Sequence, residues 1–357
     1  MKADWHITRD DGDVLHDDEA EHIALVLHTL RIDEATFRRV LAEYASRCDD
    51  SSAHLKALAA AYAVCSPHEV SFSPARSESP CPACHAIAIE KVVARRAPDE
   101  MRNGDAALVY GRCAQCGHGV LLSTAAPQSL YQHDAYYTER SACGAGYENY
   151  EQERVYRETK GGRLLDWIET AAGRAPRSLL EVGSGYGFTR RAAEQRGIPT
   201  AGVDLSPHAA EGARRLYGCA TFTGTLEQFL AAQIAGRAWD VVLYQFVLEH
   251  LTAPDAELRV AARAVAPGGY LAVIVPSMDA IEIEIFGASY RSFRNDHLHL
   301  FSHRSMELYL AGAGFVPVAR KTDCNLHLLR GFVGERALRE IYESGKGPDM
   351  FVLARRV

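Results

Sequence analysis

The segment LLEVGSGYGFTRRAAEQRGIPTAGVDLS, residues 179–206, decides the fold. A short apolar strand ends in a glycine-rich turn that leads into a helix, and a second apolar strand ends at Asp204. This order is typical of the first β-α-β unit of a nucleotide-binding α/β fold, in which an acidic residue after the second strand binds the ribose hydroxyls.

The spacing of the glycines distinguishes between two cofactors. A dinucleotide fingerprint requires its third glycine at position 188, where this sequence has Phe188. The glycines are instead Gly183, Gly185 and Gly187, and Glu181 lies two residues before the first of them. A carboxylate at this strand end suits a ligand with an ammonium group and fits poorly beside a pyrophosphate. The pattern therefore favours S-adenosylmethionine over NAD.

Strand and helix patterns alternate from about residue 160 to the end of the chain. The apolar strands that we expect are SLLEV, TAGVD, WDVVLYQ and GYLAVIV, at residues 178–182, 200–204, 239–245 and 269–275. Such alternation predicts a doubly wound parallel sheet, and hence an α/β fold.

The sequence resembles the class I S-adenosylmethionine-dependent methyltransferases over roughly residues 155 to 357. The resemblance lies in EVGSGYG, GVDLS, GTLEQF, WDVVLYQFVLEHLTAPDAEL, VAPGGYLAVIVPS and HLHLFSHRSMELYLAGAGF, which occur in the order of that family. It implies a Rossmann-like, seven-stranded sheet and an enzyme that transfers a methyl group.

The same resemblance implies roles for individual residues. The turn from Gly183 to Gly187 would pass close under the cofactor, and Asp204 would hold the ribose. Other side chains would surround the adenine or close the site. The cofactor-binding residues that we expect are Glu181, Gly183, Gly185, Gly187, Asp204, Leu205, Thr225, Leu226, Gln245 and Phe246.

Two CxxC pairs, CPAC and CAQCGHG, indicate a metal site in the first half of the chain. Four thiolates in two such knuckles suit tetrahedral Zn²⁺, and an all-cysteine shell leaves no open position, so the zinc would be structural. The expected ligands are Cys81, Cys84, Cys113 and Cys116. We expect His85 and His118, near the knuckles, to be surface residues rather than ligands.

The segment CAQCGHGVLLSTAAPQSLYQHDAYYTE, residues 113–139, extends the resemblance. Similar ribbons followed by a YY segment precede the methyltransferase domain in a bacterial group that includes deoxysugar C-methyltransferases. This implies a small-molecule acceptor from specialised or carbohydrate-related metabolism. The ribbon and its tyrosines would form part of the acceptor pocket, with candidate contacts from Tyr136, Tyr137, Tyr147 and Tyr150.

The stretch RNDHLHLFSH, residues 294–303, is rich in histidine and has three interpretations. Asp296 and His297 could form an acid/base pair, because a carboxylate can orient an imidazole, and the resembling motif in the sugar enzymes is a Glu-His pair. His297, His299 and His303 could instead bind a metal, or these side chains could be structural. The preceding residues, from about 279, form a segment long enough to cover the site as a lid.

Two further residues are candidates for catalysis. His250, in the stretch LEHL, comes just after the fourth predicted strand and should lie near the transferred methyl group. Tyr137 belongs to the tyrosine-rich segment that we expect to cover the methionine end of the cofactor.

Composition and charge limit the remaining possibilities. The net charge is -7, and residues 1–50, with 13 acidic and 6 basic side chains, account for all of it. Since no segment is strongly basic, a nucleic-acid partner is disfavoured, although an RNA-modifying methyltransferase whose ribbon holds RNA stays open. No apolar run suits a membrane helix or signal peptide, which favours a cytoplasmic enzyme with no membrane partner.

We expect three parts in the chain. They are an acidic helical segment at residues 1–75, a zinc ribbon with a tyrosine-rich connector at 76–150, and the methyltransferase domain at 151–357. The apolar faces of the N-terminal helices make a homodimer one option.

Overall fold

The computed structural model describes residues 76–95, 108–138, 146–147, 149–233, 236–286, 290, 292–323 and 344–357. The helical segment predicted at residues 1–75 therefore lies outside the described residues, as does the dimer contact expected from it. No helix in the described part of the chain is both long and apolar enough to cross a membrane.

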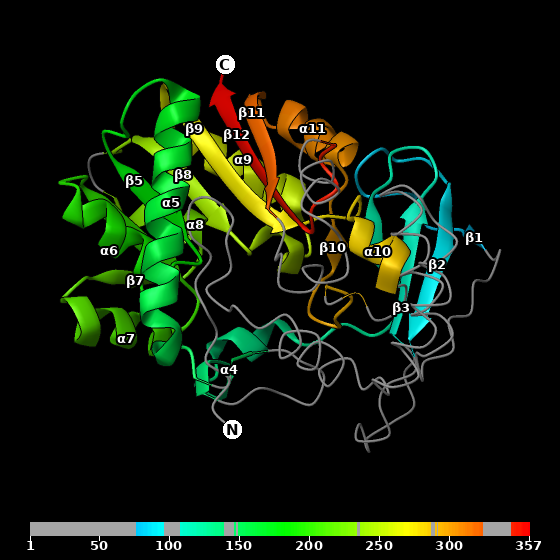
Figure 1. Ribbon diagram of the computed structural model, residues 1–357, viewed down its shortest axis with the longest axis horizontal. Helices are drawn as coiled ribbons and strands as arrows, with labels where there is room; N and C mark the ends of the chain where they lie inside the picture. The colour runs from blue at the N-terminus through cyan, green and yellow to red at the C-terminus, as the bar shows by residue number, and fades with distance from the viewer. Residues whose placement is uncertain are drawn as a thin grey trace, which may run out of the picture.

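A seven-stranded sheet forms the centre of the larger part of the molecule (Figure 1). Its order is β11-β12-β9-β8-β5-β6-β7, and the five strands from β9 to β7 are parallel, whereas β12 runs antiparallel to both β9 and β11. The predicted Rossmann-like α/β fold is thus confirmed. The strands are β5 (Leu179–Val182), β6 (Thr200–Asp204), β7 (Thr221–Thr223), β8 (Trp239–Gln245), β9 (Val265–Pro276), β11 (Phe315–Asp323) and β12 (Asp349–Arg356).

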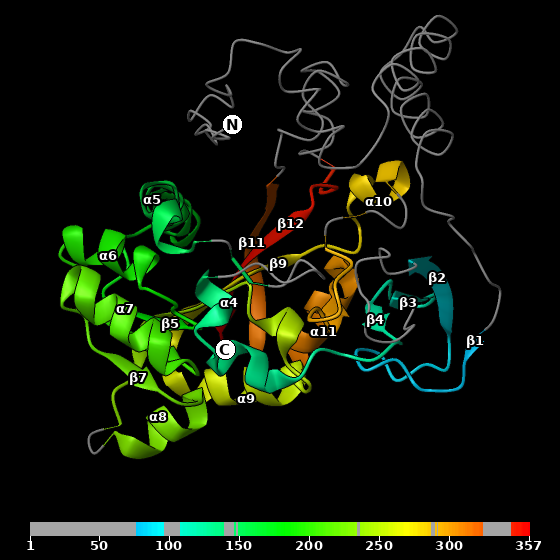
Figure 2. The ribbon, with the colours of Figure 1, turned by 90° about the horizontal axis from the view of Figure 1, so that it is seen from below.

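Helices cover both faces of this sheet because every second strand residue points to the same face. Val241 and Leu243 of β8 pack in one apolar cluster with Leu165, while Val242 and Tyr244 pack in another with Leu258. Figure 2 shows the two resulting helical layers on either side of the strands. The first layer contains α5 (Arg154–Ala172) and α6 (Phe188–Gln195), and the second contains α8 (Leu226–Ala232), α9 (Pro254–Ala264) and α11 (His303–Gly312). The helix α7 (Pro207–Tyr217) connects β6 to β7.

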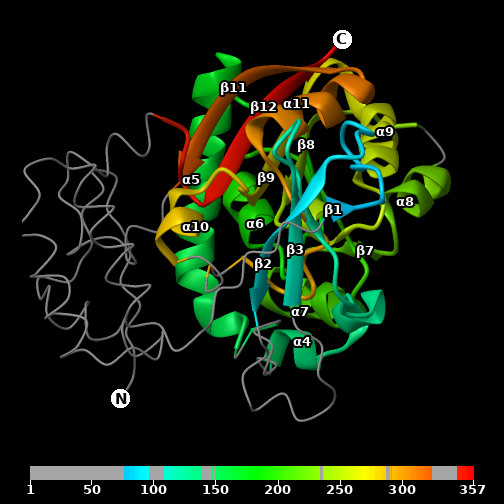
Figure 3. The same ribbon diagram turned by 90° about the vertical axis from the view of Figure 1, so that its right-hand side faces the viewer.

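A smaller, antiparallel sheet of five strands lies beside the first in Figure 1 and faces the viewer in Figure 3. Its order is β1-β2-β3-β4-β10, so the ribbon is completed by a strand from the second half of the chain. His299 and Leu300 of β10 pair with Val120 and Gly119 of β4. The small sheet and the part of the chain that forms the large sheet are therefore joined by backbone hydrogen bonds. The strands are β1 (Arg76–Ser77), β2 (Ile89–Arg95), β3 (Leu108–Cys113), β4 (Gly119–Leu121) and β10 (His299–Leu300).

Among the described residues between β9 and β10, which include α10 (Ile281–Phe286), none lines the cavity at the carboxyl ends of β5, β6 and β8 that the lid was expected to cover. The described aromatic residues of this segment pack against β3: the rings of Tyr110 and Phe293 lie 4.8 Å apart, and those of Phe293 and Tyr290 lie 5.2 Å apart. Tyr110 Oη is 2.6 Å from the carbonyl oxygen of His297. These contacts place the described aromatic residues of the expected lid against the small sheet.

Candidate active site

A cavity of about 350 Å³ lies at the carboxyl ends of β5, β6 and β8. Two short helices border it on the other side, η1 (Gln128–Gln132) and α4 (Ala135–Thr138), and Figure 1 shows α4 below this end of the sheet. Of the ten residues predicted to bind the cofactor, Gly187 alone does not line the cavity. Those that do are Glu181, Gly183, Gly185, Asp204, Leu205, Thr225, Leu226, Gln245 and Phe246.

The glycines of the turn are required by backbone conformation and by space. Gly183 and Gly185 have φ angles of +69° and +51°, which other residues rarely adopt. A Cβ atom on Gly183 would lie 2.3 Å from Cγ2 of Val247, and one on Gly185 would lie 2.8 Å from the hydroxyl oxygen of Tyr150. Gly187, with φ +79°, is the N-cap of α6. Gly187 therefore contributes to the conformation of the turn without lining the cavity.

Two carboxylates lie at the strand ends. Glu181 is 4% exposed, and among the described residues its Oε2 atom has no hydrogen-bond partner. Burial raises the pKa of this carboxyl to about 8. Asp204 accepts hydrogen bonds from the backbone amides of Gly185, at 2.8 Å, and Ser206, at 2.9 Å. These bonds fix the Asp204 carboxylate and tie the glycine turn to β6.

Aromatic side chains form the opposite wall. The cavity is lined by all four tyrosines of the predicted acceptor pocket, Tyr136, Tyr137, Tyr147 and Tyr150. The ring of Tyr137 stacks on Tyr186 with centroids 5.4 Å apart. Burial raises the pKa of Tyr137 well above its usual range, so this hydroxyl stays protonated and can donate a hydrogen bond.

Several lining residues were not predicted from the sequence. Tyr131 places its hydroxyl oxygen 2.8 Å from Nδ1 of His250, and Gln128 donates to the carbonyl of His250 at 2.7 Å. Arg157 and Lys160 of α5 also line the cavity. The tyrosine-rich pattern that indicated its neighbours includes Tyr131, but the two cations of α5 have no motif that marks them.

The predicted Asp296–His297 pair has a different geometry from the one expected. The carboxylate of Asp296 accepts two hydrogen bonds from Arg294, at 2.9 and 2.8 Å, while Nδ1 of His297 lies 2.9 Å from the carbonyl of Ser292. Asp296 therefore does not orient the imidazole. Neither Asp296 nor His297 lines the cavity; His250 does, and its ring centroid is 4.9 Å from that of His297.

The three-histidine metal site was a wrong interpretation. Nδ1 of His299 lies 3.1 Å from Nε2 of His118, whereas Nε2 of His303 lies 2.9 Å from the carbonyl oxygen of Gly345. His118 was expected at the surface but is fully buried, because it fills the contact between the ribbon and α11. His85 is exposed, as expected.

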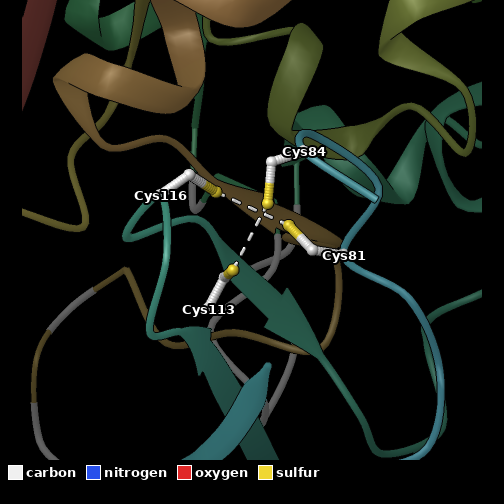
Figure 4. Close-up of side chains that lie close together, drawn as sticks. All are labelled: Cys81, Cys84, Cys113 and Cys116. Atoms are coloured by element: carbon white, nitrogen blue, oxygen red, sulfur yellow. Dashed lines mark hydrogen bonds between the residues drawn. The ribbon is translucent and has the colours of Figure 1, made fainter. Parts of the chain in front are cut away.

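The four cysteines of the ribbon lie together, with their sulfur atoms directed toward a common centre (Figure 4). The sulfurs of Cys81 and Cys116 are 3.6 Å apart, as are those of Cys84 and Cys113. Four ligands at tetrahedral Zn–S bonds of about 2.3 Å would stand about 3.8 Å from one another, so the arrangement fits this ion. Burial raises the pKa of the Cys81 thiol to about 11, and a bound cation would offset the cost of a thiolate there.

Comparison with known proteins shows what a segment of somewhat less than half of the chain is similar to. Residues 156–320 match a family model described as a methyltransferase domain. The larger sheet and its helices therefore have an α/β Rossmann-like fold, and the match over residues 156–320 supports the methyltransferase that the sequence motifs predicted.

Among curated proteins, the chain is 32% identical over 134 residues to the ubiquinone biosynthesis O-methyltransferase of Pseudomonas paraeruginosa, and 30% identical over 132 residues to that of Azoarcus sp.. Each match covers 35% of this chain and 56% of the relative. Among solved structures, it is similar to the magnesium protoporphyrin IX methyltransferase of Synechocystis PCC 6803, with 17% identity, coverage of 64% of this chain and 95% of the other, and a TM-score of 0.42.

Proposed function

We propose that the protein transfers the methyl group of S-adenosylmethionine to a hydroxyl group of a small molecule. The observation that carries this proposal is the single cavity in which Glu181, Asp204 and the glycine turn face a wall of tyrosines. Its size is in the range of small-molecule sites, so one end would take the cofactor and the other the acceptor.

The residues at the cofactor end fit this methyl donor. The carboxylate of Asp204 would accept the ribose hydroxyls, and the unpartnered oxygen of Glu181 would pair with the ammonium group of the methionine part. Arg157 and Lys160 are cations of the lining that suit its carboxylate. The bound donor would supply an electrophilic methyl group for in-line displacement, which requires alignment above all.

The residues at the acceptor end favour a substrate that contains a ring. Flat aromatic walls, among them Tyr131, Tyr136, Tyr147 and Phe246, favour stacking of a ring. The similarity to O-methyltransferases supports oxygen as the methylated atom. A natural-product or deoxysugar-type acceptor remains our proposal for the metabolic class. Deprotonation of the acceptor would fall to His250, which lines the cavity, rather than to His297, which does not.

In this proposal the four-cysteine ribbon holds structural zinc and carries one wall of the acceptor pocket. Cysteines that bind zinc and form no disulfide suit a reducing compartment, which is consistent with a cytoplasmic enzyme. No described contact favours the alternative of an RNA substrate: among the ribbon's described cations, Arg112 is paired with Asp279 at 3.1 Å.

The test is to incubate the purified protein with S-adenosylmethionine labelled on its methyl group and an extract of the source cells, and then to separate RNA, protein and small molecules. We expect label in the small-molecule fraction. An Asp204→Asn variant should transfer little label, since its ribose contact is weakened. Label in RNA, or label transfer that is the same with the variant, would contradict the proposal.

A further inference from the structure

Arg157 of α5 lies against two tyrosines of the cavity's aromatic wall. Its guanidinium carbon is 4.8 Å from the ring centre of Tyr147 and 4.5 Å from that of Tyr150. A cation within about 6 Å of an aromatic face is attracted by the negative face of the ring. One guanidinium therefore attaches both rings to α5.

Glu153, at the end of η2 (Glu151–Glu153) and one helical turn before Arg157, fixes this guanidinium. Its Oε2 atom accepts a hydrogen bond from Nε of Arg157 at 2.8 Å and lies 2.6 Å from a second guanidinium nitrogen. Arg157 lines the cavity, whereas Glu153 does not. The charge of Arg157 is therefore already paired with a carboxylate outside the cavity.

The two tyrosines held by Arg157 connect the rest of the wall to the cofactor turn. The backbone amide of Tyr147 donates to the carbonyl of Tyr136 at 2.9 Å, and that of Tyr150 donates to the carbonyl of Tyr137 at 3.0 Å. The hydroxyl oxygen of Tyr150 would stand only 2.8 Å from a Cβ atom on Gly185. A shift of Tyr150 would therefore disturb both the wall and its contact with the glycine turn.

Lys160, the other cation of α5 in the cavity lining, has a different environment. Its Nζ atom lies 5.0 Å from the ring centre of Tyr156, and no carboxylate of the described residues is paired with it. Of the two cations, Lys160 is therefore the one whose charge remains for the carboxylate of a ligand.

We propose that Arg157 is a positioning residue, which Glu153 anchors and which holds Tyr147 and Tyr150 in place without binding the cofactor carboxylate. This inference rests on the proposed methyl transfer. In-line displacement depends on the alignment of the acceptor with the methyl group, so a displaced wall slows transfer.

The first experiment compares two ligands by calorimetry: S-adenosylhomocysteine, and 5′-methylthioadenosine, which lacks the amino-acid carboxylate. Arg157→Gln should change the affinity for both ligands by the same factor. Lys160→Gln should weaken the binding of S-adenosylhomocysteine alone, by at least about tenfold, because it removes a charged hydrogen-bond donor. A loss in Arg157→Gln that is confined to S-adenosylhomocysteine would overturn the proposal, since Arg157 would then bind the carboxylate.

The second experiment measures label transfer at saturating S-adenosylmethionine, with the cell extract as the source of the acceptor. Arg157→Gln should slow transfer by at least about tenfold. Arg157→Lys should retain part of the rate, because a lysine keeps a cation near the rings but loses the planar fork that binds Glu153.

Glu153→Gln distinguishes a positioning role from a ligand role by the sign of its effect. If Arg157 positions the wall, this variant should slow transfer, because the guanidinium loses its anchor. If Arg157 were a ligand, the same change would leave its charge unpaired, and S-adenosylhomocysteine would bind more tightly. Tighter binding without slower transfer would contradict the proposal.

Arg154→Gln is the matched control, because Arg154 also belongs to α5, is paired with Glu158 at 3.6 Å and does not line the cavity. It should bind both ligands and transfer label as the wild type does. Hydrogen exchange without any ligand provides a further measurement: the peptide that carries Tyr147 and Tyr150 should exchange faster in Arg157→Gln than in Arg154→Gln.

Two results separate this inference from the proposed function. Label transfer by the wild type at the same rate as by Arg157→Gln would leave the methyltransferase proposal standing and overturn the positioning role. A wild type that binds neither ligand and transfers no label would contradict the proposed function, and the positioning role with it.

Discussion

At the scale of single residues, the site contains groups whose burial or backbone conformation lowers the stability of the folded protein. Glu181 is buried with one oxygen unpartnered, and the turn beside it holds Gly183 and Gly185 at positive φ. A protein retains such features when a ligand compensates for them. A cationic group beside Glu181 would offset the cost of burying its charge.

Glu181 gives a prediction about pH. Its pKa is raised from 4.5 to about 8, so between these values the folded protein holds a proton that the unfolded chain releases. Its contribution to stability is therefore lost as the pH rises through 8. An ammonium group beside it would displace this proton. We expect cofactor binding near pH 6.5 to release about one proton, measured by calorimetry in buffers of different ionisation enthalpy. Equal release by Glu181→Gln would refute this assignment.

At the scale of elements, the ribbon and the methyltransferase part are held together beside the metal knuckle. The N-cap residue of α11, Ser302, donates a hydrogen bond to the carbonyl oxygen of Cys116. The backbone amide of Leu121 bonds to the carbonyl of Leu298, next to the β4–β10 pairing. The buried contact of His118 and His299 closes the same junction. The knuckle therefore helps to position the segment that bears His297.

Removal of the ribbon metal should loosen this junction first. In Cys84→Ser, or after chelation, we expect faster hydrogen exchange at residues 119–121 and 298–302, with β5 and α6 unchanged. Mass spectrometry of exchanged peptides measures both regions. Cys219→Ser is the control, because Cys219 contacts Glu194 far from the ribbon. Equal protection of these residues in the wild type, in Cys84→Ser and in Cys219→Ser would show that the metal does not support the junction.

At the scale of the whole molecule, local patterns predicted four parallel strands of the large sheet and the family resemblance its seven strands, whereas contacts distant in sequence escaped prediction. The strands and the glycine turn of residues 179–206 carry apolar runs and glycine spacings that determine structure locally. The pairing of β10 with β4 involves two residues and leaves no periodic signal. The burial of His118 follows from that pairing, as does the meeting of His297 with His250.

For the proposed site, too, local motifs were predictive and distant contacts were not. Nine of the residues predicted to bind the cofactor line the cavity, because they belong to motifs at strand ends and a parallel sheet brings these ends together. The acid/base role of Asp296 and His297 stays a prediction, but the sequence did not show that Arg294, two residues away, donates to the Asp296 carboxylate. Sequence proximity indicated a partner, but only the fold shows which neighbour is bonded.

The measurement that tests the central claim most directly is a calorimetric titration with S-adenosylhomocysteine, the product form of the donor. We expect one site per chain in the wild type. Gly185→Ala should bind at least about tenfold more weakly, because a Cβ there meets Tyr150 and the positive φ becomes strained. Gly218→Ala, at φ +70° with nothing within 4 Å of the added carbon, is the matched control and should bind normally. An absence of binding by the wild type, or equal affinity in Gly185→Ala, would contradict the account.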